Sequence, residues 1–594
     1  MQLKTLSLDN FRSFKSNIIS FQPDLTILVG ENNSGKSNAL DAIRLLTPPL
    51  SSRKEIYCQL TDVRFGSGDE FDVSVLYSGL TDSQQGRLIT ASTDETMTEA
   101  QFGLTYNQTK GGYPPRPVLW GGLKGKHPEP GCHDMIRHVY LPALRDAKHA
   151  LASGNPTRIY ALLKHFLGDE DPDTIAKELA RHTDHELLSK IDKSIDVRLE
   201  ALTAGVRQQV ASLGFSKDEK LIDIARDLKF SLADHGIDPE DLSYSGHGYA
   251  NLLYMATIAV ELENVNNAEL TIFLVEEPEA HLHPQLQSAV LAFLKDQAVK
   301  SRETPPRDGA PAGELQVIVA THSPNLTASV PSQNTVFLRS LAFEVEPQGD
   351  EATAGAARSR RESRSIAIAE LLGDPKQQKK IDRYIDVTKA SFLFGGRMFL
   401  VEGIAEALLL PLLAEKFVLN GDEDAKRRFR SIAFIPIDGV DFEPYIRLLV
   451  TPQNDVRIAD KVVIVTDGDG PRTYDSGLTP GRTRQANYDE IAKTLGADDL
   501  CSTIINDYSL ETELFLAGNA KILRNAFLKI HTHSGDKWDD AVAPVGDDLA
   551  KQMHELFKDA RKGDFAQALA ELIENGEDFV VPAYLETAIR AIVE

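Results

Sequence analysis

The fold of the first half of this chain is decided by the stretch Gly30-Glu31-Asn32-Asn33-Ser34-Gly35-Lys36-Ser37. It follows the apolar run 25–29, which predicts a strand, and precedes residues 38–45, whose apolar spacing predicts a helix. Glycines in such a strand-to-helix turn let backbone N–H groups cradle phosphates, and the helix N-terminus adds positive potential. The stretch therefore predicts a phosphate-binding loop in an α/β domain.

The side chains of this loop have separate expected roles. Lys36 neutralises charge on the β- and γ-phosphates, and Ser37 offers its hydroxyl to a magnesium ion. We expect the nucleotide-binding residues of the loop to be Gly30, Asn33, Ser34, Gly35, Lys36, Ser37 and Asn38.

Three later segments agree with a nucleotide site. The turn Ser245-Gly246-His247-Gly248 precedes the helical run 250–262. The apolar run 270–275 ends in Glu276-Glu277-Pro278-Glu279, and a buried strand that ends in two acids suits magnesium ligation by Glu276 and water activation by Glu277. A further apolar run, 317–320, leads to Thr321-His322-Ser323, and we expect His322 to sense the γ-phosphate.

The order of these motifs resembles the ABC-type ATPases of the SMC-like and OLD (overcoming lysogenisation defect) group, over about residues 1–345 apart from a helical insertion. The resemblance makes Glu276 the Walker B acid, although Asp is usual there, and Glu277 the catalytic base. It makes Ser245, Gly246 and Gly248 part of the signature loop and His322 the switch histidine. Because that loop completes a partner's site in ABC enzymes, it implies a dimer that holds two ATP molecules.

Other residues near these motifs allow two interpretations. Arg12 either approaches the nucleotide or is an ordinary loop arginine, and Gln59 is a weak candidate for the Q-loop. His281 and His283 lack Cys or acidic partners at zinc-site spacing, which favours a structural role over a zinc site.

The last third of the chain alternates apolar runs with helical segments, which predicts a second, smaller parallel-sheet domain. The run 397–401 leads into Glu402-Gly403-Ile404-Ala405-Glu406, and the run 461–466 ends in Asp467-Gly468-Asp469. Alternation along an extended chain would place both aspartates on one face, where they can share a metal. Together the E-G-x-x-E and D-x-D motifs resemble the Toprim pattern, and an ABC head joined to a Toprim domain is the combination found in the OLD family.

The resemblance implies two further residues, Glu511 as an additional acid and Lys562 as the lysine at the scissile phosphate; otherwise both are solvated helix charges. It makes Glu402 and Lys562 catalytic. The expected metal ligands are Ser37 and Glu276 at the ATPase site and Glu402, Glu406, Asp467, Asp469 and Glu511 at the nuclease site. Hard oxygen ligands favour Mg²⁺ or Mn²⁺, one ion at the ATPase site and two at the Toprim site.

These patterns predict an α/β protein with five segments: ATPase residues 1–145, a helical insertion at 146–232 that is a candidate dimerisation arm, ATPase residues 233–345, a linker at 346–390 and a Toprim domain at 391–594. The predicted linker holds Arg358, Arg360, Arg361 and Arg364, so a basic DNA-contacting strip is the alternative.

Composition and charge restrict the possible functions and locations of the protein. The formal net charge of −24 argues against nonspecific adhesion to nucleic acid through the whole surface, but allows a local DNA contact. The chain shows no signal peptide and no apolar run long enough for a bilayer, and its 3 cysteines are scattered, so we expect a cytoplasmic protein without membrane contact.

The sequence as a whole predicts an ATP-regulated, divalent-metal-dependent DNA endonuclease in phage defence or DNA processing, with ATP as a cofactor and DNA and a second copy of the chain as partners. The first alternative is a non-nucleolytic ATP-driven DNA clamp, and the second is the effector subunit of a two-component system with a partner protein. Topoisomerase activity fits less well, because Tyr474, Tyr508 and Tyr584 have no recognisable nucleophile context. Primase activity fits less well, because the chain has no room for template- and nucleotide-handling modules.

Overall fold

The computed structural model describes most of the chain in ranges separated by gaps. These ranges are 1–50, 56–109, 115–122, 126–143, 171–179, 220–228, 246–262, 268–305, 310–345, 358–372, 374–384, 390–470, 477–558 and 561–594, with short pieces within 159–167 and at 231–232, 240–241 and 473–474. Most of the predicted helical insertion, and Ser245, lie outside the described residues.

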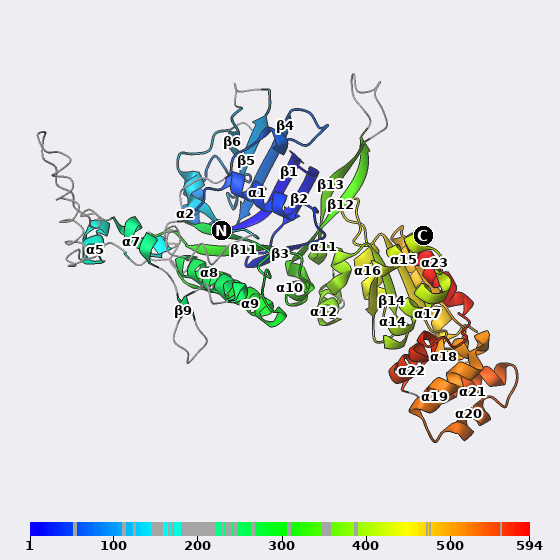
Figure 1. Ribbon diagram of the computed structural model, residues 1–594. Helices are drawn as coiled ribbons and strands as arrows, with labels where there is room; N and C mark the ends of the chain where they lie inside the picture. The colour runs from blue at the N-terminus through cyan, green and yellow to red at the C-terminus, as the bar shows by residue number, and fades with distance from the viewer. Residues whose placement is uncertain are drawn as a thin grey trace, which may run out of the picture.

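The first domain consists of two sheets with a helix between them (Figure 1). An antiparallel five-stranded sheet has the order β2-β1-β4-β5-β6. Its strands are β1 (Gln2–Phe11), β2 (Phe14–Ser20), β4 (Glu70–Ser78), β5 (Glu99–Asn107) and β6 (Val118–Gly121). Helix α1 (Lys36–Leu46) is covered by buried residues from both sheets, so the segment after the phosphate-binding loop is locked into the core.

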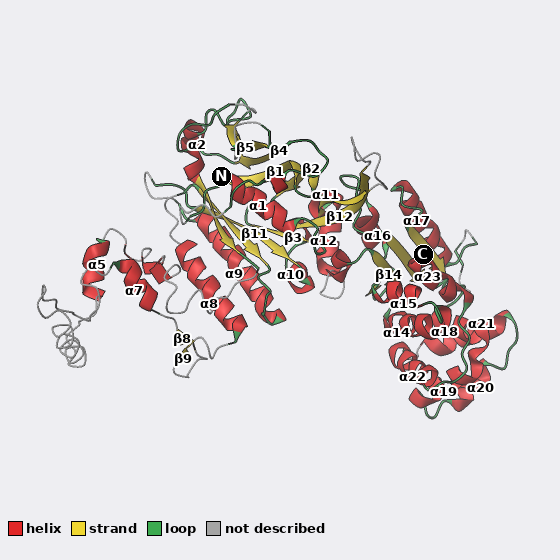
Figure 2. Ribbon diagram, turned by 45° about the horizontal axis from the view of Figure 1, so that its top comes forward, coloured by secondary structure: helices red, strands yellow, loops and turns green. Residues whose placement is uncertain are grey.

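The second sheet carries the nucleotide motifs. Its order is β13-β12-β3-β11-β10-β7, and only β13 pairs antiparallel. The strands are β3 (Leu25–Val29), β7 (Ile136–Leu141), β10 (Leu270–Glu276), β11 (Glu314–Thr321), β12 (Thr335–Val345) and β13 (Arg358–Ala367). Helices α8 (His247–Leu262), α9 (Pro284–Glu303) and α10 (Pro324–Ala328) lie along its other face, as Figure 2 shows. Because β3, β10 and β11 run parallel, their C-terminal motifs meet at one sheet edge.

The predicted linker at 346–390 needs correction, because part of it belongs to the ATPase sheet. Residues 358–367 form β13, which pairs with β12 over ten residues. Composition suggested a loop, but small buried serines fit this edge: Ser365 Oγ accepts from Asn17 Nδ2 at 2.8 Å, and Ser363 Oγ donates to Ser13 Oγ at 2.7 Å. Helices α11 (Ile368–Leu372) and α12 (Pro375–Tyr384) follow.

The arginines of β13 are partly engaged within the chain. The Arg360 guanidinium lies 3.9 Å from the centroid of the Phe65 ring, and Arg364 forms an ion pair with Glu362. Arg361 is exposed. These contacts leave less free positive charge than the sequence suggested for a DNA-contacting strip.

The second domain contains the predicted parallel sheet, in the order β15-β14-β16-β17. Its strands are β14 (Arg397–Val401), β15 (Ala433–Pro436), β16 (Lys461–Thr466) and β17 (Cys501–Ile505). The helices around the sheet are α14 (Ile404–Leu413), α15 (Glu423–Arg430), α16 (Glu443–Val450), α17 (Pro480–Thr494) and α23 (Ala583–Val593). The strand order reverses direction between β14 and β16, which is where open α/β sheets bind their ligands.

A group of helices lies below this sheet in Figure 1, whereas the C-terminal helix α23 packs beside the sheet. The group comprises α18 (Leu510–Leu514), α19 (Ala520–Ile530), α20 (Gly535–Ala541), α21 (Asp547–Lys558) and α22 (Lys562–Glu574). Trp538 and Phe557 are buried at its centre, with ring centroids 6.2 Å apart. This packing fixes α22, whose first residue is Lys562, beside α14.

Buried His138 makes the first domain sensitive to acid. It lies in β7, is 3% exposed, and its Nδ1 is 2.8 Å from Thr47 Oγ1 at the end of α1. Burial and the nearby Arg44 lower the pKa of His138 to about 4. An unfolded His binds a proton near pH 6.5, so stability is retained above that pH and is lost as the pH falls toward 4.

We expect this one group to remove about 2 kcal/mol of stability between pH 7.5 and pH 5. Urea unfolding at both pH values measures the loss, and the H138Q variant should lose that much less. An equal pH dependence in wild type and variant would contradict this prediction. Exposed His127 offers a matched control, because H127Q should leave the pH dependence unchanged.

Candidate functional site

The phosphate-binding loop has the strained backbone that its glycines permit. Gly35 has a φ of 106°, and at Gly30 (φ 148°) a Cβ would lie 2.1 Å from the Leu338 carbonyl oxygen. Lys36 Nζ donates to the carbonyl oxygens of Gly30 and Glu31, both at 2.9 Å. The lysine is therefore bonded into its own loop.

The pKa of Lys36 reflects the charged side chains around it. Burial lowers the pKa of Lys36 to about 8, and the charges of Glu277, Glu279 and Glu276 act in the opposite direction. The acids at the end of β10 therefore lie near the loop, as the motif order predicts. Ser37 is exposed in the first turn of α1, where its hydroxyl can reach a ligand.

The two predicted acids differ in their surroundings. Glu276 Oε2 accepts a hydrogen bond from the Tyr140 hydroxyl at 2.7 Å, and the Tyr140 ring lies under Arg44, 3.6 Å from its guanidinium carbon. Glu277 has a φ of 44°, a left-handed conformation that is strained for a non-glycine residue, and its N–H donates to the Ala320 carbonyl at 2.8 Å. Such strain is found at functional sites, where the surrounding structure maintains it.

His322 is held by Glu279, a residue to which the sequence assigned no role. Glu279 Oε1 accepts from the Thr321 hydroxyl at 2.8 Å and from the His322 N–H at 2.9 Å. Its Oε2 is buried and makes no hydrogen bond within the described part of the chain. Burial and the charge of Lys36 lower the pKa of His322, which bonds to the Gly30 backbone. Thus Glu279 joins the acid turn to the histidine loop.

The described part of the predicted signature loop faces outward. Gly246 is exposed, and at Gly248 a Cβ would lie 2.5 Å from the His281 carbonyl oxygen. The close packing explains why glycine is needed at 248 and places the loop beside the turn that follows Glu279.

Arg12 and the α1 helix form an ion-pair network. Arg12 bonds to Asp41 at 2.7 Å, to Asp62 at 2.8 Å and to the Asn38 side chain at 3.2 Å. Asn38 also donates to Ser13 Oγ at 2.9 Å. Arg12 therefore has a structural use, and Gln59 is exposed beside the same network, where its N–H donates to Asp62.

In the second domain, Glu402 and Asp467 follow the neighbouring strands β14 and β16, at the point where the strand order reverses. Glu402 Oε1 accepts from the Thr466 hydroxyl and from the Asp467 N–H, the latter at 2.7 Å. Asp467 Oδ1 accepts from Asn506 Nδ2 at 2.8 Å. The topology thus brings together two acids that are distant in the sequence.

Two further acids and a lysine complete this group. Glu406 in the first turn of α14 accepts from the Gly403 N–H at 3.1 Å. Glu511, at the start of α18, is 2% exposed and lies 3.2 Å from Lys562 Nζ. The charges of Glu511 and Asp467 outweigh burial and raise the pKa of Lys562. The sequence-predicted residues, which lie in or directly after five separate elements, therefore gather around one centre.

Arg484 of α17 was not found in the sequence analysis, yet it lies among these acids. It donates to Asp469 Oδ2 at 2.8 Å and to the Asp467 carbonyl at 2.9 Å, and lies 3.7 Å from Glu402 Oε1. Asp469 itself has a φ of 56°, so the extended alternation expected from Asp467 does not continue to it. A lone arginine within a helix carries no sequence signal for this position.

The carboxylate cluster fits divalent metal ions by its chemistry. Among the described residues, no three His, Cys, Asp or Glu side chains already form a closed metal-binding group. However, burial and the charges of Glu402 and Glu511 raise the pKa of Glu406 to about 7, and burial with the same neighbouring acids raises that of Asp467. Such crowded negative charge is what a hard divalent cation relieves.

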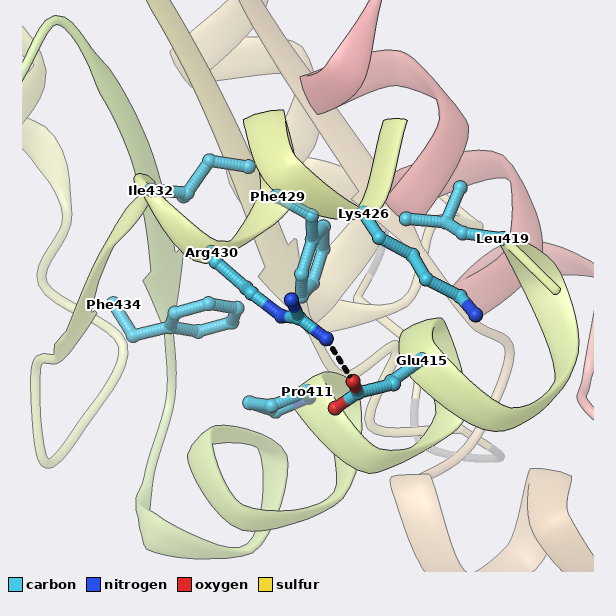
Figure 3. A pocket seen from close by; sticks show the side chains of 8 residues that line it. All are labelled: Pro411, Glu415, Leu419, Lys426, Phe429, Arg430, Ile432 and Phe434. Carbon is cyan, nitrogen blue, oxygen red and sulfur yellow. Dashed lines mark hydrogen bonds and ion pairs between the residues drawn. The ribbon is translucent and has the colours of Figure 1, made fainter. Parts of the chain in front are cut away.

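A pocket on the second domain lies away from these acids (Figure 3). The Arg430–Glu415 ion pair crosses it, and Phe429 and Phe434 form part of its wall. Ile432 lies before β15, whereas Gly439, which bonds to the Glu402 carbonyl, lies after it. The pocket is therefore at the opposite end of the strand from the carboxylate cluster.

Comparison with known families agrees with this geometry. The family model for the AAA ATPase domain matches residues 1–94 and 141–327. The model for the TOPRIM domain of proteins like the overcoming lysogenization defect protein matches residues 393–469. The chain combines an AAA ATPase domain with an OLD-like TOPRIM domain. The predicted fold class and the resemblance to the OLD family are thereby confirmed.

Individual relatives match different shares of this chain. The Old nuclease of Escherichia phage P2 is 25% identical over 464 residues, which are 74% of this chain and 73% of that protein. A RecF DNA replication and repair protein of Lactococcus lactis is 39% identical over 80 residues, 13% of this chain and 20% of its own length. A solved C-terminal region of the Burkholderia pseudomallei OLD protein is 24% identical, with a TM-score of 0.25, over 33% of this chain and 96% of that one.

In the ranges that the structure describes, no helix is both long and apolar enough to cross a bilayer.

Proposed function

We propose that this chain is a divalent-metal-dependent DNA endonuclease whose activity is controlled by ATP. The observation that carries the proposal is the convergence of Glu402, Glu406, Asp467 and Glu511 with Lys562 at the reversal point of the TOPRIM sheet. The similarity to the Old nuclease supports the same reaction class. Four carboxylates facing one site exceed what DNA binding alone requires, which is why cleavage is preferred to a passive clamp.

Glu402, Glu406, Asp467, Asp469 and Glu511 would together hold two Mg²⁺ or Mn²⁺ ions. When bound, such a pair activates a water and stabilises the leaving 3′-oxygen. Lys562 stabilises charge at the scissile phosphate. Asn506 orients Asp467, and Arg484 neutralises Asp469 and Glu402 until it is displaced.

The ATPase residues have matching roles in this proposal. Lys36 exchanges its loop carbonyls for phosphate oxygens, and Ser37 and Glu276 hold one magnesium ion. Glu277 accepts the proton of the attacking water, and His322 contacts the γ-phosphate. The loop containing Ser245, Gly246 and Gly248 completes the site of a second copy, so two ATP molecules lie in a dimer.

The proposal includes a biological setting. We place the protein in the cytoplasm, where it acts on DNA in phage defence or DNA processing. The same proposal includes a partner protein that is encoded by a neighbouring gene. Co-purification with the products of the neighbouring genes tests this part.

The test is cleavage of DNA by the purified full chain. Supercoiled, relaxed and linear DNA are incubated with Mg²⁺ or Mn²⁺, each with and without ATP, and separated on a gel. We expect nicked or linear product that requires the metal. Intact DNA of every form under all these conditions would contradict the proposal.

A further inference from the structure

The β12–β13 hairpin touches the phosphate-binding loop directly. The three residues Thr335–Phe337 of β12 pair in parallel with the end of β3. Immediately beyond, a Cβ at Gly30 would lie 2.1 Å from the Leu338 carbonyl oxygen, and a Cβ at Gly35 would lie 2.7 Å from Ser363 Oγ. Because two glycines of the loop have no free space against this hairpin, a loop movement toward the hairpin must displace it.

The residue after Leu338 reaches the other domain. Arg339 donates through Nη1 to the carbonyl oxygens of Arg457 and Ile458, the latter at 2.8 Å, and through Nη2 to Asp460. Its side chain is only 13% exposed. One planar guanidinium thus binds three groups of a single TOPRIM loop, an arrangement that a lysine cannot reproduce.

That loop supports both strands that carry the acids. Asp460 directly precedes β16, which leads to Asp467, and its N–H donates to the Gly396 carbonyl at 2.6 Å. Gly396 directly precedes β14, which leads to Glu402. A Cβ at Gly396 would overlap the Asp460 carboxylate, so this contact is close-packed.

Further contacts join the end of the β12–β13 hairpin to the TOPRIM domain. The Ala367 N–H at the end of β13 donates to Gln453 Oε1 at 2.8 Å, and Asn454 Nδ2 donates to the Ser365 carbonyl at 2.9 Å. One continuous buried cluster contains Val29 and Val319 of the ATPase sheet together with Leu400 and Ile464 of the TOPRIM sheet. The two domains therefore share a core instead of hanging on a flexible tether.

We infer that Arg339 is a positioning residue that transmits the nucleotide state of the loop to the TOPRIM acids through the β12–β13 hairpin. The inference rests on the proposed function and names the regulation of that site. In the present state Lys36 is bonded to carbonyl oxygens of its own loop. When phosphate oxygens replace these carbonyls as the acceptors of Lys36, the loop glycines press on Leu338 and Ser363, and Arg339 shifts the base of β14 and β16. The phosphate-binding loop has two states, with and without phosphate, and both the nucleotide site and the TOPRIM site influence the equilibrium between them.

The experiment compares R339A, R339K and wild-type full chain in DNA cleavage with and without ATP. R447A is the matched control, because Arg447 also pairs with an acid of the TOPRIM domain, Glu443, but only within its own helix. Coupling between sites commonly amounts to about 5- to 150-fold. We expect R339A to bring the ratio of the two cleavage rates to about 1, with R339K intermediate, while ATP hydrolysis and cleavage without ATP stay near wild type.

A second measurement does not need cleavage. Hydrogen exchange of the amides at 457–462 is followed on addition of a non-hydrolysable ATP analogue. We expect exchange in this loop to change in wild type and R447A and to stay constant in R339A. A nucleotide effect in R339A equal to that in wild type, in either measurement, would overturn the inference, as would a wild type without any nucleotide effect. Absence of cleavage in wild type together with the exchange change would instead reject only the proposed nuclease.

Discussion

E402A is expected to lower the rate of metal-dependent DNA cleavage at least about 10²- to 10³-fold, the scale of removing a group that stabilises charge in a transition state. Glu402 follows β14, is bonded to Thr466 and the Asp467 N–H, and lies among the acids of the cluster. Its loss removes a proposed metal ligand and leaves the Asp467 N–H without its acceptor. ATP hydrolysis should remain at the wild-type rate, because the nucleotide site lies in the other domain.

The control for this prediction is E415A. Glu415 is an exposed acid of the same domain, paired with Arg430 at the pocket of Figure 3. Because alanine at 402 removes the acceptor of the buried Thr466 hydroxyl, E402Q is measured in parallel to retain one acceptor, and thermal unfolding confirms folding. Cleavage by E402A at the parent rate would show that another group performs the reaction.

E277Q is expected to lower ATP hydrolysis about 10²- to 10⁴-fold, the usual contribution of a general base. The glutamine keeps the size of the side chain and the left-handed backbone at 277 but cannot accept the proton. ATP binding should be retained, since Lys36 and the loop are unchanged. An ATP-bound dimer should therefore accumulate.

Phosphate release and light scattering in the presence of ATP measure these two effects. E303Q is the control, because Glu303 ends α9 far along the chain from the β10 motif and is exposed. Unaltered hydrolysis by E277Q would show that another residue is the general base. The E279Q variant then tests whether Glu279 is that base or only holds His322 in place.

Much of this architecture could be predicted because each strand with a function is a short apolar run that ends in a polar motif. The runs that became β3, β10, β11, β14 and β16 carry the loop, the acids and the histidine at their C-terminal ends. Parallel strands then place these ends at one sheet edge without further information. Glu276, Glu277, Glu402 and Asp467 were found this way, whereas Glu511 came only from the family resemblance.

The residues that escaped prediction contribute through tertiary contacts. Arg484, Asn506 and Tyr140 reach the acids from elements whose place depends on sheet order, and no local spacing announces them. Strand β13 was missed because arginine- and serine-rich sequence has low apolar periodicity, whereas its stability comes from pairing with β12 and from serines against β2. Most of residues 146–232 lie outside the described residues, so the helical arm stays a prediction.

The most direct test of the central claim is to remove the metal from the full chain and to restore it. The initial rate of plasmid cleavage is measured before chelation, after chelation and dialysis, and after addition of Mg²⁺ or Mn²⁺. The account predicts that cleavage is lost with the metal and returns with either ion in wild type, but not in E402A. Cleavage that persists without a divalent ion, or that the ions fail to restore in correctly folded protein, would contradict it.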